Sequence, residues 1–385
     1  MVALIIILVL LFLNLVTFLV YGWDKRKARK GKWRVSESTL LGLAVIGGSA
    51  GAWLGMKYWH HKTLHKKFRY GIPAIIFLQI LIPCLLLLGG GFYMLHYSLN
   101  PDGREANDQW RKTHALEQYP GLQDWAEGLQ DKGILRDTFI INHEGLRLHA
   151  YYAACPDARG TAILVHGYTD TAWSMMMLGR MYRNELQYNI LLPEHERHGL
   201  SEGEVIQMGW HDRINLEQWI SVTEQLWPGK PIFLHGISMG AATVMMCSGD
   251  PLPTSVKGII EDCGYTSVWD EFSGEIQNQF GLPVHPLMDI SSWLCDLKYG
   301  WNFKEASALN QVAQSTLPML FIHGDADTFV PTAMVYPLYE AKQHGYKKLW
   351  ITEGVTHAQS YHQYPDAYLR EVKEFTGKCT RSSRR

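Results

Sequence analysis

The chain has 385 residues, enough for two or three domains, and its formal net charge is −1 at pH 7. This balance gives no support to nucleic-acid binding, which relies on a basic surface to meet the phosphate backbone. Hydrophobic residues make up 47% of the sequence, and they are concentrated in its first quarter. That uneven spread predicts a membrane domain at residues 1–99, followed by a globular part.

The first predicted element is a membrane-spanning helix at residues 2–20, a stretch without charged residues. It is long enough to cross about 30 Å of hydrocarbon. No basic residue precedes it and no small-residue cleavage site follows it, so we interpret it as an uncleaved anchor rather than a secretory signal. Basic residues cluster between Lys25 and Arg34. The positive-inside rule therefore places this end of the helix in the cytoplasm.

The second element, residues 39–56, is also uncharged, and we expect either a short span or a re-entrant hairpin. It contains the string GGSAG, which matches the G-x-S-x-G pattern of serine hydrolases. No strand is predicted before Ser49, however, and the pattern requires a strand followed by a helix. Gly47, Gly51 and Gly55 instead recur every four residues, a spacing that lets membrane helices approach closely. We predict a packing role for them.

A third uncharged segment, residues 71–97, is the second predicted full span. A further basic loop, between Lys57 and Arg69, precedes it. If residues 39–56 form a hairpin, both basic loops are cytoplasmic, and the third segment carries the globular part to the extracytoplasmic side. We favour this arrangement.

The first quarter has a family resemblance as well. The strings YGWDKRKA, WRVSESTLL, GGSAGAWLGMK and HHKTLHKKF resemble a small bacterial membrane-domain family of unassigned function, over about residues 18–90. This resemblance implies no chemistry. His60, His61 and His65 stand among lysines and arginines, so we interpret them as part of a basic juxtamembrane face rather than a metal site.

Residues 100–134 are predicted to be a helical linker that packs on the domain, and residues 135–376 alternate short apolar strands with helices. This alternation predicts an α/β fold with a mostly parallel sheet and helices on both faces. Residues 264–316 are rich in aromatic side chains, and they form either a cap over the site or an ordinary helical crossover. Residues 377–385 are expected to be a basic tail. The expected strands are 137–142, 146–154, 161–165, 189–192, 232–234, 256–260, 317–322 and 349–352.

The second G-x-S-x-G string, GISMG at residues 236–240, lies between a predicted strand and a predicted helix. This is the setting of a nucleophile elbow, so Ser238 is the predicted nucleophile. In the chain order Ser, Asp, His, the acid and the base follow later strands. Asp327 is the predicted acid, with Asp325 and Asp262 as alternatives, and His357 is the predicted base.

An oxyanion hole requires backbone N–H groups that point at the developing charge. We expect them from Met239, directly after the nucleophile, and from Tyr168, in the loop after an early strand. His166, His235 and His323 each precede a glycine at a strand end. We expect these three histidines to be hydrogen-bonding scaffold residues.

The strings HGYTD, ERHGLS, HGISMG, HGDADTFVP and GVTHA resemble the α/β-hydrolase superfamily, in its serine aminopeptidase and monoglyceride lipase-like branch, over about residues 135–376. The family more often has R-G-H-G where this chain has Glu196-Arg197-His198-Gly199, which leaves the role of His198 open. The resemblance implies the fold and the triad, not the substrate.

The sequence thus predicts a membrane-anchored serine hydrolase that cleaves an ester, thioester or amide through an acyl-enzyme on Ser238, without cofactor or metal. The expected substrate is a small or lipid-like acyl compound. A serine peptidase or aminopeptidase is one alternative, and a membrane-bound interaction module with a non-catalytic hydrolase domain is another. If the domain lies on an oxidising side, Cys263 and Cys295 are candidates for a disulfide.

Overall fold

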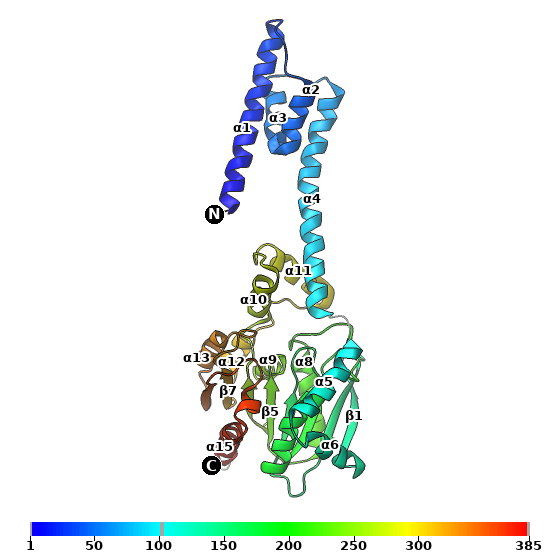
Figure 1. Ribbon diagram of the computed structural model, residues 1–385, viewed down its shortest axis with the longest axis vertical. Helices are drawn as coiled ribbons and strands as arrows, with labels where there is room; N and C mark the ends of the chain where they lie inside the picture. The colour runs from blue at the N-terminus through cyan, green and yellow to red at the C-terminus, as the bar shows by residue number, and fades with distance from the viewer. Residues whose placement is uncertain (1, 101–103, 383–385) are drawn as a thin grey trace. The chain divides into compact units, whose positions relative to one another are not determined.

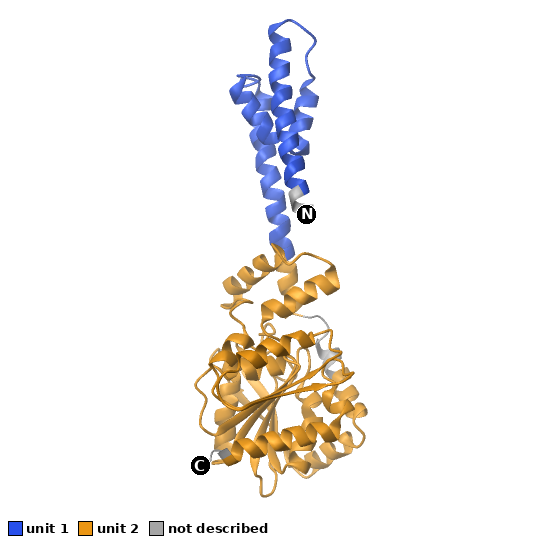
Figure 2. Cartoon of the chain, turned by 90° about the vertical axis from the view of Figure 1, so that its left-hand side faces the viewer, with its two compact units in different colours: residues 1–90 blue, residues 91–385 orange. Residues whose placement is uncertain are grey.

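The computed structural model describes residues 2–100 and 104–382. It divides into two compact units, residues 1–90 and residues 91–385 (Figure 2). Each unit has its own buried core, and we describe the two in turn.

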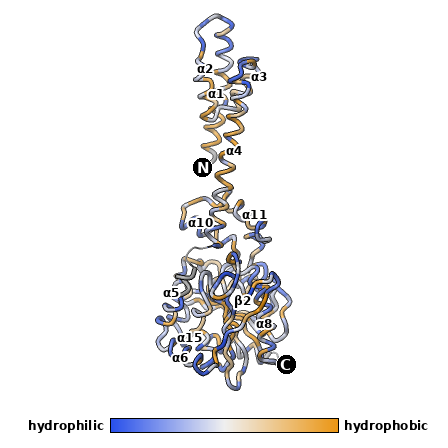
Figure 3. The backbone as a smooth tube through the Cα atoms, turned by 90° about the vertical axis from the view of Figure 1, so that its right-hand side faces the viewer, coloured by the Kyte–Doolittle hydropathy of each residue, from blue (hydrophilic) through white to orange (hydrophobic). Residues whose placement is uncertain are grey.

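The first unit is helical. Three of its stretches are long and apolar enough to cross a membrane: Ile5–Arg29, Glu37–Tyr58 and Lys66–Leu99. The tube coloured by hydropathy shows apolar residues along most of both long helices (Figure 3). The helices are α1 (Val2–Arg29), α2 (Glu37–Leu43), the π-helical turn η1 (Ala44–Gly48), α3 (Ser49–Tyr58) and α4 (Lys66–Leu99), which continues into the second unit (Figure 1).

The middle segment is a hairpin rather than a straight helix. It breaks at Gly47, whose φ of 119° favours glycine. Both arms lie beside Tyr21 of α1: its hydroxyl donates to the carbonyl of Leu40 at 3.3 Å, and a β-carbon on Gly55 would stand 2.9 Å from its Cβ. The tip at Gly47 lies against Leu10. The hairpin therefore reaches about 16 Å along α1, roughly half the thickness of a hydrocarbon core.

Two polar side chains from the long helices hold the hairpin tip. Asn14 of α1 donates to the carbonyl of Gly47 at 2.8 Å and accepts from the N–H of Gly51 at 2.7 Å. Gln79 of α4 donates to two carbonyls of η1. The Ser49 hydroxyl donates to Gln79 Oε1 at 2.6 Å. Backbone groups at the break thus have side-chain partners, and Ser49 has a structural partner.

The second unit is an eight-stranded sheet with helices on both faces. Its strands are β1 (Leu135–Ile141), β2 (Arg147–Ala153), β3 (Gly160–Val165), β4 (Tyr188–Pro193), β5 (Ile232–Ile237), β6 (Val256–Asp262), β7 (Met319–Gly324) and β8 (Lys347–Thr352). Its helices are α5 (Arg104–Gln118), α6 (Leu122–Asp131), η2 (Ala172–Met175), α7 (Met176–Arg180), η3 (Met181–Glu185), α8 (Asp212–Leu226), α9 (Met239–Cys247), α10 (Val268–Phe280), α11 (Leu287–Tyr299), α12 (Ala308–Gln314), η4 (Thr332–Met334), α13 (Val335–Ala341), α14 (Ser360–Gln363) and α15 (Pro365–Ser382).

The sheet order is β1-β2-β4-β3-β5-β6-β7-β8 (Figure 1). β2 pairs antiparallel with both β1 and β4, and the pairs from β4 to β8 are parallel. Alternate residues of β3 enter different cores: Ile163 and Val165 pack in the core that contains α9 residues, and Ala162 and Leu164 pack in the core that contains α15 residues. Both faces are therefore apolar, as in buried parallel sheets. The fold is the α/β-hydrolase architecture that the sequence predicts.

Some segment boundaries differ from the sequence-based ones. The two units divide within α4, because Leu95 and Leu99 are buried in the core of the second unit. α6 also buries its apolar face in that unit, so this part of residues 100–134 packs on the fold. α15 continues to Ser382 with Cys379 buried, so the expected tail is helical up to there. Residues 383–385 lie outside the described residues.

The segment 264–316 contains three helices with different roles. α10 and α11 pack against each other, whereas α12 packs against α9 and α13 beside the sheet. A strand-like bridge joins Ser267 to Ser307 at the base of this excursion. The cap is therefore formed by α10 and α11, and α12 is the crossover helix that returns the chain to β7.

Candidate active site

Ser238 lies at the sharp turn between β5 and α9. Its φ of 56° and ψ of −121° are strained for a residue with a side chain. The glycines on either side are sterically required: a β-carbon on Gly236 would overlap the carbonyl oxygen of Gly240, and one on Gly240 would overlap that of Val165. The turn is held by a hydrogen bond from the Ser238 N–H to the carbonyl of Asp262 at 2.8 Å.

The structure brings the predicted nucleophile, base and acid into one hydrogen-bonded chain. His357 Nε2 lies 2.8 Å from Ser238 Oγ, and His357 Nδ1 lies 2.7 Å from Asp327 Oδ2. Asp327 follows β7 and His357 follows β8, so three separate strand ends contribute one group each. With Nδ1 donating to the carboxylate, Nε2 is free to accept the serine proton.

Asp327 is held as a carboxylate. Its Oδ1 accepts the N–H groups of Phe329 and Val330 at 3.0 and 3.1 Å. Burial alone would raise the pKa of Asp327, but hydrogen bonds from His323 and His357 outweigh burial and lower the pKa to about 2. His323 also contacts the carbonyl of Val330 at 3.0 Å, so it fixes the acid loop in the way predicted for a scaffold histidine.

The two alternative acids have other partners. Asp325 accepts the N–H of Gly354 at 2.7 Å and so links the loops after β7 and β8. Asp262 accepts the hydroxyl of Tyr368 at 2.9 Å. Burial raises the pKa of Asp262 to about 6, although the Tyr368 hydrogen bond opposes this shift. Tyr368 also bonds to His235 at 2.8 Å, so this pair is part of a buried scaffold beneath the triad.

The loop after β3 runs past the nucleophile. A β-carbon on Gly167 would lie 3.4 Å from Ser238 Cβ, and Tyr168, the next residue, lines the same cavity as Ser238 and Met239. His166 holds this loop: its Nδ1 contacts the carbonyl of Gly167 at 2.8 Å, and its Nε2 accepts the N–H of His195 at 3.1 Å. The loop is therefore anchored with Tyr168 beside the nucleophile.

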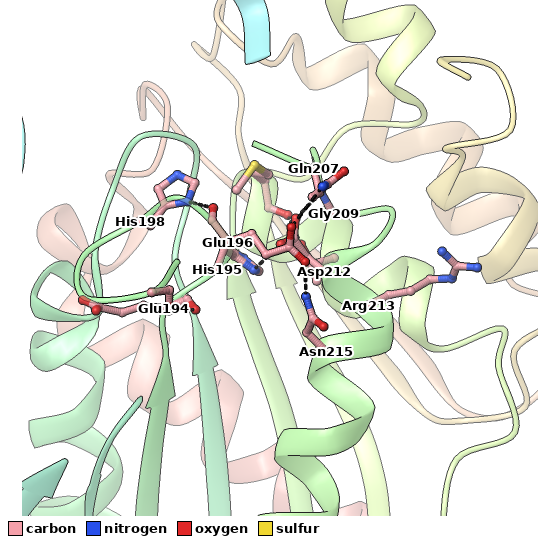
Figure 4. Close-up of polar contacts among 12 residues, drawn as sticks. Glu194, His195, Glu196, His198, Gln207, Gly209, Asp212, Arg213 and Asn215 are labelled. Carbon is pink, nitrogen blue, oxygen red and sulfur yellow. Dashed lines mark hydrogen bonds and ion pairs between the residues drawn. The ribbon is translucent and has the colours of Figure 1, made fainter. Parts of the chain in front are cut away.

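His198 supports the same loop from the segment after β4. Its Nε2 accepts the N–H of Thr169 at 3.1 Å. Its Nδ1 contacts the carbonyl of Glu196 at 2.8 Å, a bond drawn in Figure 4. This chain departs from the family pattern at residues 196–199 but keeps a histidine there. That histidine, His198, positions Thr169, the residue after Tyr168.

A buried polar network underlies His198 and was not expected from the sequence. Glu196 accepts from Asn215 and Gln207 at 2.8 and 3.0 Å, and these side chains converge on its carboxylate in Figure 4. Burial and the nearby charge of Asp212 raise the pKa of Glu196 to about 7, while the two amides act in the opposite direction. Single asparagine and glutamine residues that are separated in the sequence form no recognisable motif. These side chains come together only in the folded protein.

Ser238 borders a cavity of about 550 Å³. Its wall combines the elbow, the cap helix α10 and the last turns of α4, from which Tyr93, Met94 and Tyr97 contribute. Tyr168 reaches the same turns, since its hydroxyl donates to the carbonyl of Ser98 at 2.7 Å. No sequence pattern indicates that residues of the predicted third span line a cavity in the hydrolase fold.

Cys263 lies beside the triad, and its sulfur, Asp327 and His357 are the one group of three potential metal ligands in residues 2–100 and 104–382. Asp327 and His357 already bond to each other, and His357 also bonds to Ser238, so two of these three groups are held within the triad. The disulfide considered between Cys263 and Cys295 is not present: both are buried free thiols, and they lie in different cores.

Comparisons with known proteins match the two parts separately. Residues 14–68 match a family model described as a protein of unknown function, DUF1294. A 73-residue stretch, 19% of this chain, is 44% identical to the uncharacterized protein YsdA of Bacillus subtilis and covers 82% of it. A 242-residue stretch, 62% of this chain, is 28% identical to the uncharacterized protein YqkD of the same organism and covers 79% of it.

Solved structures resemble the second unit in fold. The Pyrococcus furiosus esterase Pf2001 matches with a TM-score of 0.53 and 22% identity over 65% of this chain and 95% of that one. A puromycin-hydrolyzing peptidase of Mycobacterium tuberculosis matches with a TM-score of 0.51 and 16% identity, over 64% of this chain and 39% of that one. At these identities the likeness concerns the fold.

Proposed function

The chain belongs to the DUF1294 family through its N-terminal part and has the α/β-hydrolase fold in the rest, and we propose that it is a membrane-anchored serine hydrolase. The observation that carries this proposal is the continuous hydrogen-bonded chain from Ser238 through His357 to Asp327. A serine in a strained elbow, a histidine within reach and a buried carboxylate behind it form the arrangement that acyl transfer requires.

In the proposed reaction, Ser238 Oγ attacks the substrate carbonyl while His357 Nε2 takes its proton. Asp327 holds the imidazole with Nδ1 protonated and stabilises the imidazolium that forms. The N–H groups of Tyr168 and Met239 stabilise the negative charge on the carbonyl oxygen. His357 then gives the proton to the leaving group as the acyl-enzyme forms. A water molecule next attacks the acyl carbonyl while His357 takes its proton, and His357 returns that proton to Ser238 Oγ as the acid product leaves.

Membrane anchoring is supported by the architecture of the first unit. Two long apolar helices and one hairpin support a topology of two full crossings, and in that topology both basic loops fall on one side of the membrane and the hydrolase fold on the other. Under the positive-inside rule the loops are cytoplasmic and the hydrolase is extracytoplasmic. The cavity is lined largely by apolar side chains, which favours an acyl ester or thioester substrate.

Two alternatives predict different outcomes. A serine peptidase would use the same triad on an amide, and one structural neighbour is a peptidase. A non-catalytic interaction module would not need a nucleophile, a base and an acid that are hydrogen-bonded in sequence. The intact triad therefore favours the enzyme.

A fluorophosphonate probe tests the proposal on the detergent-solubilised full chain. We expect covalent labelling that is lost in Ser238→Ala and retained in Ser49→Ala, which removes the serine of the other G-x-S-x-G string. A folded, unsubstituted protein that resists the probe would contradict the proposal in favour of the interaction module. A panel of ester, thioester and aminopeptide substrates then separates esterase from peptidase.

A further inference from the structure

The cap helix α10 places two carboxyl groups in the wall of the active-site cavity. Glu271 and Glu275 are one helical turn apart, and both line the cavity that Ser238 borders. In residues 2–100 and 104–382 the cavity wall includes no lysine or arginine, and His96 is its single basic side chain. The titratable side chains of this wall are therefore predominantly acidic.

Glu271 is the more deeply placed of the two. It is 6% exposed, and its Oε2 has no hydrogen-bond partner in the described part of the chain. Burial raises the pKa of its carboxyl well above the usual range, and the charges of Glu275 and Asp327 act in the same direction. Buried carboxyl groups in proteins are normally paired, because an unpaired one costs free energy. The Glu271 carboxyl group therefore lacks the hydrogen-bond donor or cation that normally accompanies a buried carboxyl group.

The rest of the wall favours a cation. Four tyrosines and four phenylalanines line the cavity, and the faces of aromatic rings attract ammonium groups, primary or quaternary. A neutral hydroxyl could bond to Glu271 but would gain little from Glu275 or from the rings. An ammonium group would interact favourably with all three features at once.

We propose that the cavity binds acyl substrates that carry an ammonium group, with Glu271 as the counter-ion. This inference rests on the proposed serine hydrolase function, since it concerns the substrate of the same site. The ammonium group could belong to the amino group of an aminoacyl or peptide compound or to a lipid headgroup. The chemistry that recognises it is shared.

The test compares three p-nitrophenyl esters on the full chain in detergent: those of octanoic acid, ω-amino-octanoic acid and ω-trimethylammonio-octanoic acid. We expect kcat/KM to be at least about tenfold higher for one or both cationic esters than for the neutral one, the effect expected for a desolvated charge pair. The better cationic ester identifies the source, primary amine or quaternary headgroup.

Variants assign the effect to its residue. In Glu271→Gln we expect the cationic-to-neutral ratio of kcat/KM to fall towards one, through a higher KM for the cationic ester. Glu275→Gln should lower the ratio less, because Glu275 is more exposed and already accepts a bond from Gln279. Glu127→Gln removes an exposed carboxylate of α6, outside the cavity, and should keep the original ratio.

Equal rates for the three esters, or a preference for the neutral ester, would overturn the inference and leave the hydrolase proposal intact. No hydrolysis of any ester, together with no fluorophosphonate labelling, would overturn both. The ratio in the unsubstituted protein decides the matter even where Glu271→Gln does not fold.

Discussion

Three aspartates are candidates for the acid of the triad by their positions in the sequence, and a single hydrogen bond distinguishes Asp327 from the other two. Asp325, Asp327 and Asp262 all stand at strand ends near the site, and only Asp327 contacts His357 among the hydrogen bonds described. The sequence places all three aspartates at the same edge of the sheet. Side-chain direction separates them, and it depends on the turns after β6 and β7.

Asp327→Asn is expected to lower kcat by roughly a thousandfold to ten-thousandfold, because an amide favours the wrong imidazole tautomer. The measurement is ester hydrolysis with KM determined separately. Asp325→Asn is the matched control, and we expect a small change there. A comparable loss in both variants would contradict the assignment of the acid.

His198 is expected to act on the transition state through the loop that carries Tyr168. His198→Ala removes the acceptor for the N–H of Thr169, and we expect kcat to fall by about tenfold, as for one lost hydrogen bond, with KM nearly unchanged. His198→Gln offers a new acceptor and should restore part of the rate. An unchanged kcat in the alanine variant would show that the loop holds its position without His198.

Glu196 gives the fold a specific pH dependence. Its pKa is raised to about 7 in the folded protein, so the folded state binds its proton more tightly than the unfolded state does. The contribution to stability is complete below a pH of about 4.5, the ordinary pKa of a glutamate side chain. It is lost as the pH rises through about 7, by up to roughly 3 kcal/mol.

Thermal unfolding of the unsubstituted protein and of Glu196→Gln at several pH values between about 5 and 8 isolates this contribution. The difference in stability between the two should move in favour of the variant as the pH rises. A constant difference would mean that Glu196 titrates alike in the folded and unfolded states.

At the scale of elements, the tight crossing of β5, α9 and β3 determines the elbow. Gly240→Ala would drive a β-carbon into the carbonyl oxygen of Val165, so we expect a loss of more than about 3 kcal/mol of stability or no folded protein. Gly274 in α10 has open space where a β-carbon would stand: apart from its chain neighbours and the nearby backbone of its own helix, no heavy atom of the described residues lies within 4 Å. Gly274→Ala should therefore be neutral or stabilising by up to about 1 kcal/mol.

The hairpin at residues 37–58 depends on polar contacts between helices. Gln79→Leu removes the donor to two carbonyls of η1 and the acceptor for Ser49. We expect a loss of about 1–2 kcal/mol, measured by unfolding in mixed micelles of rising SDS content. Ser49→Ala removes one of these bonds and should cost less. An equal cost would indicate that the carbonyl contacts of Gln79 contribute little.

The elements differ in how far the sequence determines them. The strand, turn and helix around Ser238 are contiguous, so local patterns suffice to predict the elbow. The hairpin depends on Asn14 and Gln79, which come from other helices, and the sequence left a straight span open. Glu271 was not predicted because its burial depends on how α10 lies over the sheet, which no local periodicity specifies.

At the scale of the whole chain, the proposed topology of two crossings puts the hydrolase fold on the extracytoplasmic side. Ser221→Cys places a thiol on an exposed position of α8, and Lys30→Cys places one in the first basic loop. Both variants are made in a chain with Cys84 and Cys155 replaced by serine. In intact cells an impermeant maleimide should label the Ser221→Cys variant, and it should label the Lys30→Cys variant only after permeabilisation. The reverse pattern would contradict the extracytoplasmic placement.

The last turns of α4 have a practical consequence for protein engineering. Leu95 and Leu99 are part of the hydrolase core, and Tyr93 and Tyr97 line its cavity. A soluble fragment cut at the apparent end of the membrane domain, near residue 100, would have an incomplete core and one missing cavity wall. A fragment that starts at Gly91 keeps both. Transplanting this hydrolase-fold unit onto a different N-terminal segment, or replacing that segment with a tag, should therefore succeed only when residues 91–99 move with it.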